Sequence, residues 1–163
     1  MGKNLSITPD NFIEPKKSIH GELDGKQLTI GIVCAKFNQF ITKSLLMGAI
    51  KGLVDHNVNE ENIDTFWVPG AFEVPIVMAT KFPNYDAMIA IACVIQGDTP
   101  HFDYVCKGIT EGVTLAINDH KKPGIFCVLT TNNQREAEER SKPDKTNKGY
   151  EAAISAIEMA NLI

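Results

Sequence analysis

The sequence predicts an α/β domain in which helices cover both faces of a parallel β-sheet. Apolar runs rich in Ile and Val, such as 28–35 and 86–96, are typical of strands that are buried on both faces. Segments with apolar residues at helical spacing follow these runs, and the strand–helix alternation occurs four times. Because repeated strand–helix units build a parallel sheet with helices on both sides, we expect a three-layer αβα architecture.

An arm and two strand–helix units are expected in the first half of the chain. Residues 1–27 are polar and interrupted by prolines and glycines, which predicts an extended or flexible amino-terminal arm. Pro75 is compatible with a helix because it falls in the first turn, where a missing N–H costs little. The expected elements are a strand at 28–35, a helix at 41–56, a strand at 62–69 and a helix at 72–82.

Two more units and a closing helix are expected in the second half. The run 86–96 is the most apolar of the chain, so we expect it at the centre of the sheet. Asn132 or Asn133 can cap a helix that ends at Arg140. We expect a single domain over residues 28–163. Its later elements are a strand at 86–96, a helix at 102–120, a strand at 124–131, the helix ending at Arg140 and a helix at 147–163.

Composition and charge argue against several classes of protein. The formal net charge is -4 and Lys and Arg form no run, so we expect no nucleic-acid binding through clustered cations. No stretch approaches the run of about 18 apolar residues that spans a bilayer, and the amino terminus lacks the apolar core of a signal peptide. We therefore expect a cytoplasmic protein. The four cysteines show neither a C-x-x-C pair nor zinc-ligand spacing, which predicts reduced thiols and no metal site.

The fold class indicates where functional residues should lie. In open parallel sheets, ligands bind outside the carboxyl ends of the strands. The segments that follow those ends are 35–40, 68–73, 95–101 and 129–133. We expect the functional residues in these four segments.

The segment 96–103, QGDTPHFD, is the most suggestive of them. The amides of Gly97, Asp98 and Thr99 can cradle a phosphate near a helix N-terminus, although an inward Asp98 carboxylate would oppose an anion. His101 opens the next helix, and a histidine can exchange protons near neutral pH. An ordinary turn with a capping side chain and a solvated histidine explains the same residues, so both interpretations stay open here.

Four other side chains each allow a structural and a functional interpretation. Glu73 is either a carboxylate stabilised by a helix N-terminus or an acceptor for a polyhydroxylated substrate. Phe37 and Phe126 are either core residues or rings that stack on a planar heterocycle. Arg140 either pairs with Glu136 at i,i+4 or binds a phosphate.

Five strings in the chain resemble one family when they are taken together. Their content, order and spacing closely resemble lumazine synthase from about Leu28 to Leu162, so the amino-terminal arm lies outside the resemblance. The strings are F-N-x-F-I-T at 37–42, VPGAFEVP at 68–75, GDTPHFDYV at 97–105, FCVLTT at 126–131 and NKGYEAA at 147–153.

The resemblance implies a flavodoxin-like fold and a reaction. In that reaction 5-amino-6-(D-ribitylamino)uracil and 3,4-dihydroxy-2-butanone 4-phosphate give 6,7-dimethyl-8-ribityllumazine, phosphate and water, the penultimate step of riboflavin biosynthesis. No metal or organic cofactor is implied. A homo-oligomer with active sites at subunit interfaces is implied, namely a pentamer. Assembly into a sixty-subunit shell and association with riboflavin synthase stay open.

The resemblance also implies a role for each candidate residue. His101 would be the general acid and base, and Glu73 would bond the ribityl hydroxyls. Phe126 and Lys148 would reach the site from a neighbouring subunit or its edge, beside Glu151. The aminouracil and ribityl site would consist of Phe37, Ala71, Phe72, Glu73, Val94, Ile95, Phe126 and Lys148, and the phosphate site of Gly97, Asp98, Thr99 and Arg140.

The chain departs from the family pattern at two places. Gln96 stands where many relatives have Arg, which removes a positive charge without removing the site. Residues 141–145, SKPDK, replace a stretch with Gly and Thr that helps to decide assembly in the family. Two alternatives stay open: a riboflavin synthase of the related archaeal type, acting on lumazine alone, and a lumazine- or flavin-binding or shell-forming protein without catalysis.

Overall fold

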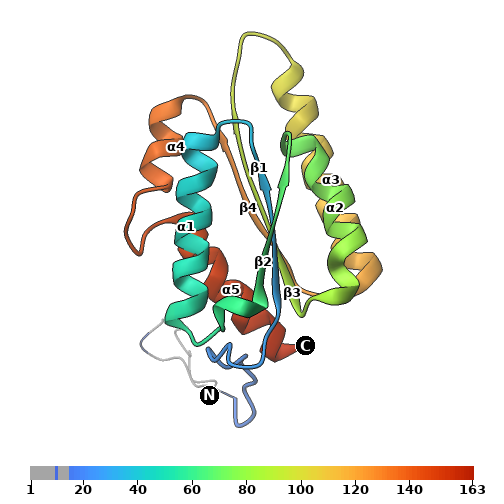
Figure 1. Ribbon diagram of the computed structural model, residues 1–163, viewed down its shortest axis with the longest axis vertical. Helices are drawn as coiled ribbons and strands as arrows, with labels where there is room; N and C mark the ends of the chain where they lie inside the picture. Colours follow the sequence, from blue (N-terminus) through green and yellow to red (C-terminus); the bar gives the residue numbers. More distant parts are fainter. Residues whose placement is uncertain (1–9, 11–14) are drawn as a thin grey trace, which may run out of the picture.

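The computed structural model describes residue 10 and residues 15–163 of the chain. An all-parallel four-stranded sheet, ordered β2-β1-β3-β4, is formed by β1 (Ile30–Ala35), β2 (Ile63–Val68), β3 (Ala87–Ile95) and β4 (Gly124–Thr131). One face is covered by α1 (Gln39–Asp55), α4 (Gln134–Arg140) and α5 (Lys148–Leu162), and the other by α2 (Val74–Lys81) and α3 (His101–His120) (Figure 1). This arrangement confirms the predicted three-layer αβα fold, and it is consistent with a flavodoxin-like one.

Local capping decides two helix boundaries. Helix α1 begins at Gln39, earlier than expected, because Asn38 takes a left-handed conformation (φ 55°) and its carbonyl accepts the amide of Ile41. Asn133 is the residue that caps α4, since its side chain accepts the amide of Glu136. The short 3₁₀ turn η2 (Glu60–Asn62), which precedes β2, was not predicted.

The helix expected over 72–82 is divided into three pieces. They are the 3₁₀ turn η3 (Ala71–Glu73), helix α2 and the 3₁₀ turn η4 (Phe82–Asn84). Pro75 has no N–H to donate to the carbonyl of Ala71, and that carbonyl instead accepts the amide of Val74 at 3₁₀ spacing. The expected continuous helix was therefore wrong at both ends.

The core lies on both sides of the two inner strands. Every residue of β1 is buried, and β3 is buried from Ala87 to Val94, as expected of strands covered on both faces. The side chains pack in two clusters, one beneath α1 and α5 and the other beneath α2 and α3. All four cysteines lie within the described residues and are free thiols, and Cys34, Cys93 and Cys127 are buried. The structure thus agrees with the prediction of thiols without disulfide bonds.

Small residues allow α1 and α5 to approach closely. A Cβ atom at Gly149 in α5 would lie 1.9 Å from the carbonyl oxygen of Leu45 in α1. A Cβ atom at Gly52 in α1 would lie 2.8 Å from the Cβ atom of Ala153. Because the backbones are this close, the first turn of α5, which carries Lys148, is held firmly against α1.

We expect Gly149→Ala to lower the free energy of unfolding by roughly 2–3 kcal/mol, because the new methyl group meets backbone that cannot move aside without shifting a helix. Urea denaturation followed by circular dichroism measures this difference. Gly97→Ala is the matched control, since a Cβ atom there would meet nothing within 4 Å. Equal unfolding midpoints for the two variants would contradict the close packing of α1 and α5.

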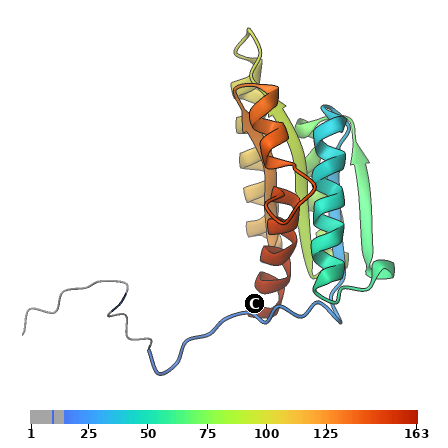
Figure 2. The same ribbon diagram turned by 90° about the vertical axis from the view of Figure 1, so that its left-hand side faces the viewer.

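The described part of the amino-terminal arm runs across the end of the domain that holds the carboxyl terminus (Figure 2). The amide of Gly25 donates to the carbonyl of His56 (2.8 Å), and the Asn161 side chain donates to the carbonyls of Glu22 (2.7 Å) and Asp24 (3.0 Å). Residues 15–27 form neither a helix nor a strand. The rest of the predicted arm, residues 1–9 and 11–14, lies outside the described residues.

Candidate functional site

Backbone hydrogen bonds join the turns at the carboxyl ends of the strands. The amide of Phe37, just after β1, donates to the carbonyl of Pro69, just after β2 (3.0 Å). The amide of Gln96, just after β3, donates to the carbonyl of Thr131 at the end of β4 (2.9 Å). These bonds fix the distances between the segments in which we expected functional residues.

Two aromatic rings are exposed at this edge of the sheet. Phe37 is 69% exposed and Phe72 is 62% exposed, so neither ring belongs to the core of the single chain. The Phe72 ring contacts α3 at Gly108, where a Cβ atom would lie 2.3 Å from the ring. Ala71, the residue before Phe72 in the same 3₁₀ turn, is buried. Exposed rings on a fixed backbone are suited to stacking on a planar ligand or packing against another chain.

The carboxylate of Glu73 is held by the turn that carries it. Its Oε2 atom accepts the amide of Gly70 (2.8 Å), and the side chain is exposed. A carboxylate has acceptor sites left after one such bond. The structural interpretation of Glu73 is therefore correct, and it is compatible with a second role as an acceptor for hydroxyl groups.

The end of β3 leads through an exposed loop into α3. Val94 is nearly buried and Ile95 half-buried, whereas residues 97–99 are exposed. His101 is the first residue of α3, as predicted, and its side chain is exposed. The next side chain, Phe102, packs into the cluster beneath α2 and α3. Phe102 therefore anchors the start of the helix while His101 stays at the surface.

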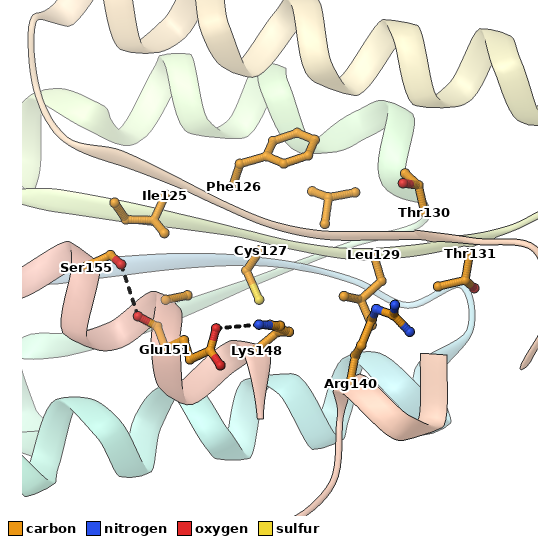
Figure 3. A pocket seen from close by; sticks show the side chains of 12 residues that line it. Ile125, Phe126, Cys127, Leu129, Thr130, Thr131, Arg140, Lys148, Glu151 and Ser155 are labelled. Carbon is orange, nitrogen blue, oxygen red and sulfur yellow. Dashed lines mark hydrogen bonds and ion pairs between the residues drawn. The ribbon is translucent and has the colours of Figure 1, made fainter. Parts of the chain in front are cut away.

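A pocket of about 370 Å³ opens along β4, which is an edge strand (Figure 3). Phe126 and Thr130 lie on one side of the strand, and Cys127 and Leu129 on the other, as the alternation of side chains in a strand requires. Phe126 is 43% exposed. We call this the β4 pocket, and it is lined by Ile125, Phe126, Cys127, Val128, Leu129, Thr130, Thr131, Arg140, Lys148, Glu151, Ala152 and Ser155.

Two cations face this pocket. Lys148 is the first residue of α5, where the helix dipole disfavours a positive charge, and Glu151 pairs with it at 2.6 Å. Arg140 ends α4, and its Nη1 atom donates to the carbonyl of Glu136 (2.8 Å). The amide of Asn132 donates to the Glu136 carboxylate and holds its pKa below the ordinary value. The i,i+4 contact expected for Arg140 thus uses a carbonyl, and a guanidinium has further N–H donors for an anion.

The thiol in the β4 pocket is not a nucleophile. Burial raises the pKa of Cys127 to about 12, with smaller contributions in the same direction from Cys34 and Glu151 and an opposing one from Lys148. A thiol with such a pKa is protonated at neutral pH, and only the thiolate attacks carbonyl groups well. Cys127 is therefore not expected to act as a nucleophile in this pocket.

The predicted site falls into two parts. Among the described residues, the lining of the β4 pocket includes Phe126, Arg140 and Lys148 but not Phe37, Glu73 or His101. Arg140 thus lies with Phe126 and Lys148, and the loop 97–99 does not line that pocket. We call the other part the carboxyl-edge group, which consists of Phe37, Ala71, Phe72, Glu73, Val94, Ile95, Gly97, Asp98, Thr99 and His101.

A comparison of the sequence with models of protein families identifies the family of this chain. The model of the family described as 6,7-dimethyl-8-ribityllumazine synthase matches residues 27–163. The chain belongs to the lumazine synthase family. It is therefore a transferase of riboflavin biosynthesis, which confirms the resemblance seen in the five strings.

Two general properties of this lumazine synthase family member can be read from the described residues. No group of three or more His, Cys, Asp or Glu side chains among them is placed to hold a metal ion. No helix among them is long and apolar enough to cross a membrane. The cytoplasmic location stays a prediction.

Some residues of the β4 pocket were not predicted. Thr130 lies four residues after Phe126, so the two-residue period of a strand could have placed both on the same side. Ser155 lies one helical turn after Glu151, and its hydroxyl donates to the Glu151 carbonyl (3.2 Å). Helical spacing from Glu151 could therefore have predicted that Ser155 lies in the same pocket.

Proposed function

We propose that this lumazine synthase family member condenses 5-amino-6-(D-ribitylamino)uracil with 3,4-dihydroxy-2-butanone 4-phosphate to give 6,7-dimethyl-8-ribityllumazine, phosphate and water. One observation carries the proposal: an exposed ring, a carboxylate and a histidine each follow the carboxyl end of a different strand, with Phe37 after β1, Glu73 after β2 and His101 after β3. Family membership supports the same reaction.

The chemistry of this condensation matches the side chains present. An amine attacks the ketone and water leaves to form an imine, which loses phosphate by elimination. The second amine then attacks the remaining carbonyl and closes the ring with loss of a second water. Each step needs a proton to be taken up or released, which a positioned histidine supplies. Holding two substrates face to face lowers much of the remaining barrier. No nucleophilic side chain is needed, in agreement with the protonated thiol of Cys127.

We assign the aminouracil to the carboxyl-edge group. Phe37 stacks on the pyrimidine ring, and the backbone of Val94 and Ile95 binds its edge. Glu73 accepts ribityl hydroxyls beside Ala71 and Phe72, because its carboxylate has acceptor sites beyond the bond from Gly70. His101 takes and returns protons at the reacting centre.

We assign the phosphorylated ketone to the loop Gly97–Asp98–Thr99 and to Arg140. A guanidinium binds a phosphate with two parallel hydrogen bonds and stabilises the negative charge that develops as phosphate leaves. Arg140 fits this role because it is exposed and near the end of β4, where it shares a pocket with Lys148.

We propose that two subunits complete one site. The β4 pocket of one copy, with Phe126, Arg140 and Lys148, would face the carboxyl-edge group of the next copy. A head-to-tail contact of this kind can close into a ring, which is compatible with the expected pentamer. Assembly into a sixty-subunit shell and association with riboflavin synthase stay predictions.

The decisive experiment is a steady-state assay with both substrates, in which the lumazine chromophore is followed without added metal or cofactor. We expect product formation that requires both compounds. Formation of riboflavin from lumazine alone would indicate a riboflavin synthase instead. A folded, pure protein that binds lumazine but forms no product would leave a binding or shell protein on this fold.

A further inference from the structure

Asn38 occupies an unusual position between two strands. It is the N-cap of α1 in a left-handed conformation, and its side chain makes no hydrogen bond to that helix. Asparagine is among the few residues that adopt this conformation readily. Its Nδ2 atom instead donates to the carbonyl of Cys93 in β3 (2.9 Å). The side chain that would ordinarily cap a helix therefore links the end of β1 to the end of β3.

The strand register explains why this link is needed. The pairing of β1 with β3 ends at Cys34 opposite Ile91, so β3 continues beyond its neighbour. Cys93 is 2% exposed, and a buried carbonyl without a partner costs about 1–3 kcal/mol. The amide of Asn38 takes the place of the missing strand partner.

The same turn is bound to β2 on its other side. The amide of Lys36 donates to the carbonyl of Val68 (2.8 Å), next to the bond from Phe37 to Pro69. Residues 36–38 therefore bridge the ends of both neighbouring strands. The backbone bonds fix the turn to the segment that leads to Glu73, and the side chain of Asn38 links the turn to β3.

We propose that Asn38 is a positioning residue for the aminouracil half of the site. This inference rests on the proposed function, in which Phe37 stacks on the pyrimidine and the backbone of Val94 and Ile95 binds its edge. Asn38 lies next to Phe37, and it bonds the residue that precedes Val94, so it sets the distance between the stacking ring and the edge-binding backbone. The phosphate loop is held separately at its start, because the amide of Gln96 donates to the carbonyl of Thr131 (2.9 Å).

The test compares two variants that each lose one hydrogen bond between β1 and β3. Asn38→Gly keeps the left-handed conformation and removes the side chain. Thr29→Val is the matched control, because the Thr29 hydroxyl donates to Asp86 (2.9 Å) at the opposite ends of the same strands. Both variants are first checked by urea denaturation, and each should retain the native fold with a modestly lowered midpoint.

The readouts separate the two halves of the site. A misplacement of about 1 Å can cost about 100-fold in rate, and the loss of one hydrogen bond should cause a smaller disturbance. We therefore expect Asn38→Gly to bind the lumazine product roughly tenfold more weakly, as measured by fluorescence titration. Its KM for the aminouracil should rise by a similar factor. The inhibition constant of inorganic phosphate, measured as a competitor of the phosphorylated ketone, should not change. Thr29→Val should match the wild type in all three measurements.

Wild-type turnover with both substrates is measured first. Its absence would overturn the proposed function and the role of Asn38 with it. An active wild type whose Asn38→Gly variant binds lumazine normally would overturn the inference alone. Equally weak lumazine binding in Thr29→Val would also overturn it, and so would an equal loss of affinity for lumazine and for phosphate in Asn38→Gly. In either case a general loss of stability would explain the result.

Discussion

Replacing His101 with alanine is expected to lower kcat roughly 100- to 10,000-fold, the contribution that a general acid–base residue makes. The side chain is exposed on the first turn of α3, while Phe102 in the same turn packs against the core. The substitution should therefore leave the fold and its unfolding midpoint unchanged. KM values should change little, since the lost interaction acts on proton transfer. Steady-state kinetics with both substrates varied measures these quantities.

The matched control lies at the other end of the same helix. His120 is the last residue of α3, and its ring packs against Phe82 at 5.5 Å between centroids, far along the chain from the carboxyl-edge group. His120→Ala should lower the unfolding midpoint modestly and leave turnover unchanged. Unchanged turnover in His101→Ala would remove His101 from the mechanism, and equal losses in both variants would indicate damage to α3.

The sequence predicted the layers of this fold well because burial of both faces leaves continuous apolar runs. The strand at 124–131 was predicted with the bounds that the structure shows. The ends of α1 and α2 were predicted less well, since they depend on single residues. Asn38 starts α1 early through its left-handed conformation, and the missing N–H of Pro75 creates a 3₁₀ turn before α2. Periodicity does not register such effects.

The candidate residues could be predicted from the sequence, but their arrangement could not. The positions of Phe37, Glu73 and His101 follow from the rule that ligands bind at the carboxyl ends of parallel strands. The grouping of Arg140 with Phe126 depends on strand order, because β4 lies at an edge and leaves a pocket beside α5. Chain order does not specify strand order, so this grouping required the structure.

Replacing Arg140 with alanine is expected to raise the KM for 3,4-dihydroxy-2-butanone 4-phosphate roughly 10- to 100-fold, the range for losing hydrogen bonds to a charged group. The KM for the aminouracil should change little, since that substrate is assigned to the carboxyl-edge group. Arg135→Ala is the matched control, because Arg135 is on the same helix and pairs with Glu139 (3.1 Å) outside the pocket. Equal losses for both substrates would contradict the phosphate role.

The Arg140 variant also tests whether one site draws on two subunits. If His101 and Arg140 of different copies meet in one site, co-expression of His101→Ala with Arg140→Ala creates some sites that contain both native side chains. For random mixing in a symmetric ring, about one quarter of the sites are native, so at a ketone concentration well below the wild-type KM the mixture should recover about a quarter of wild-type activity. Sites built within single subunits would all carry one substitution. Activity no higher than the mean of the two pure variants would therefore contradict the shared site, even if each substitution alone behaves as expected.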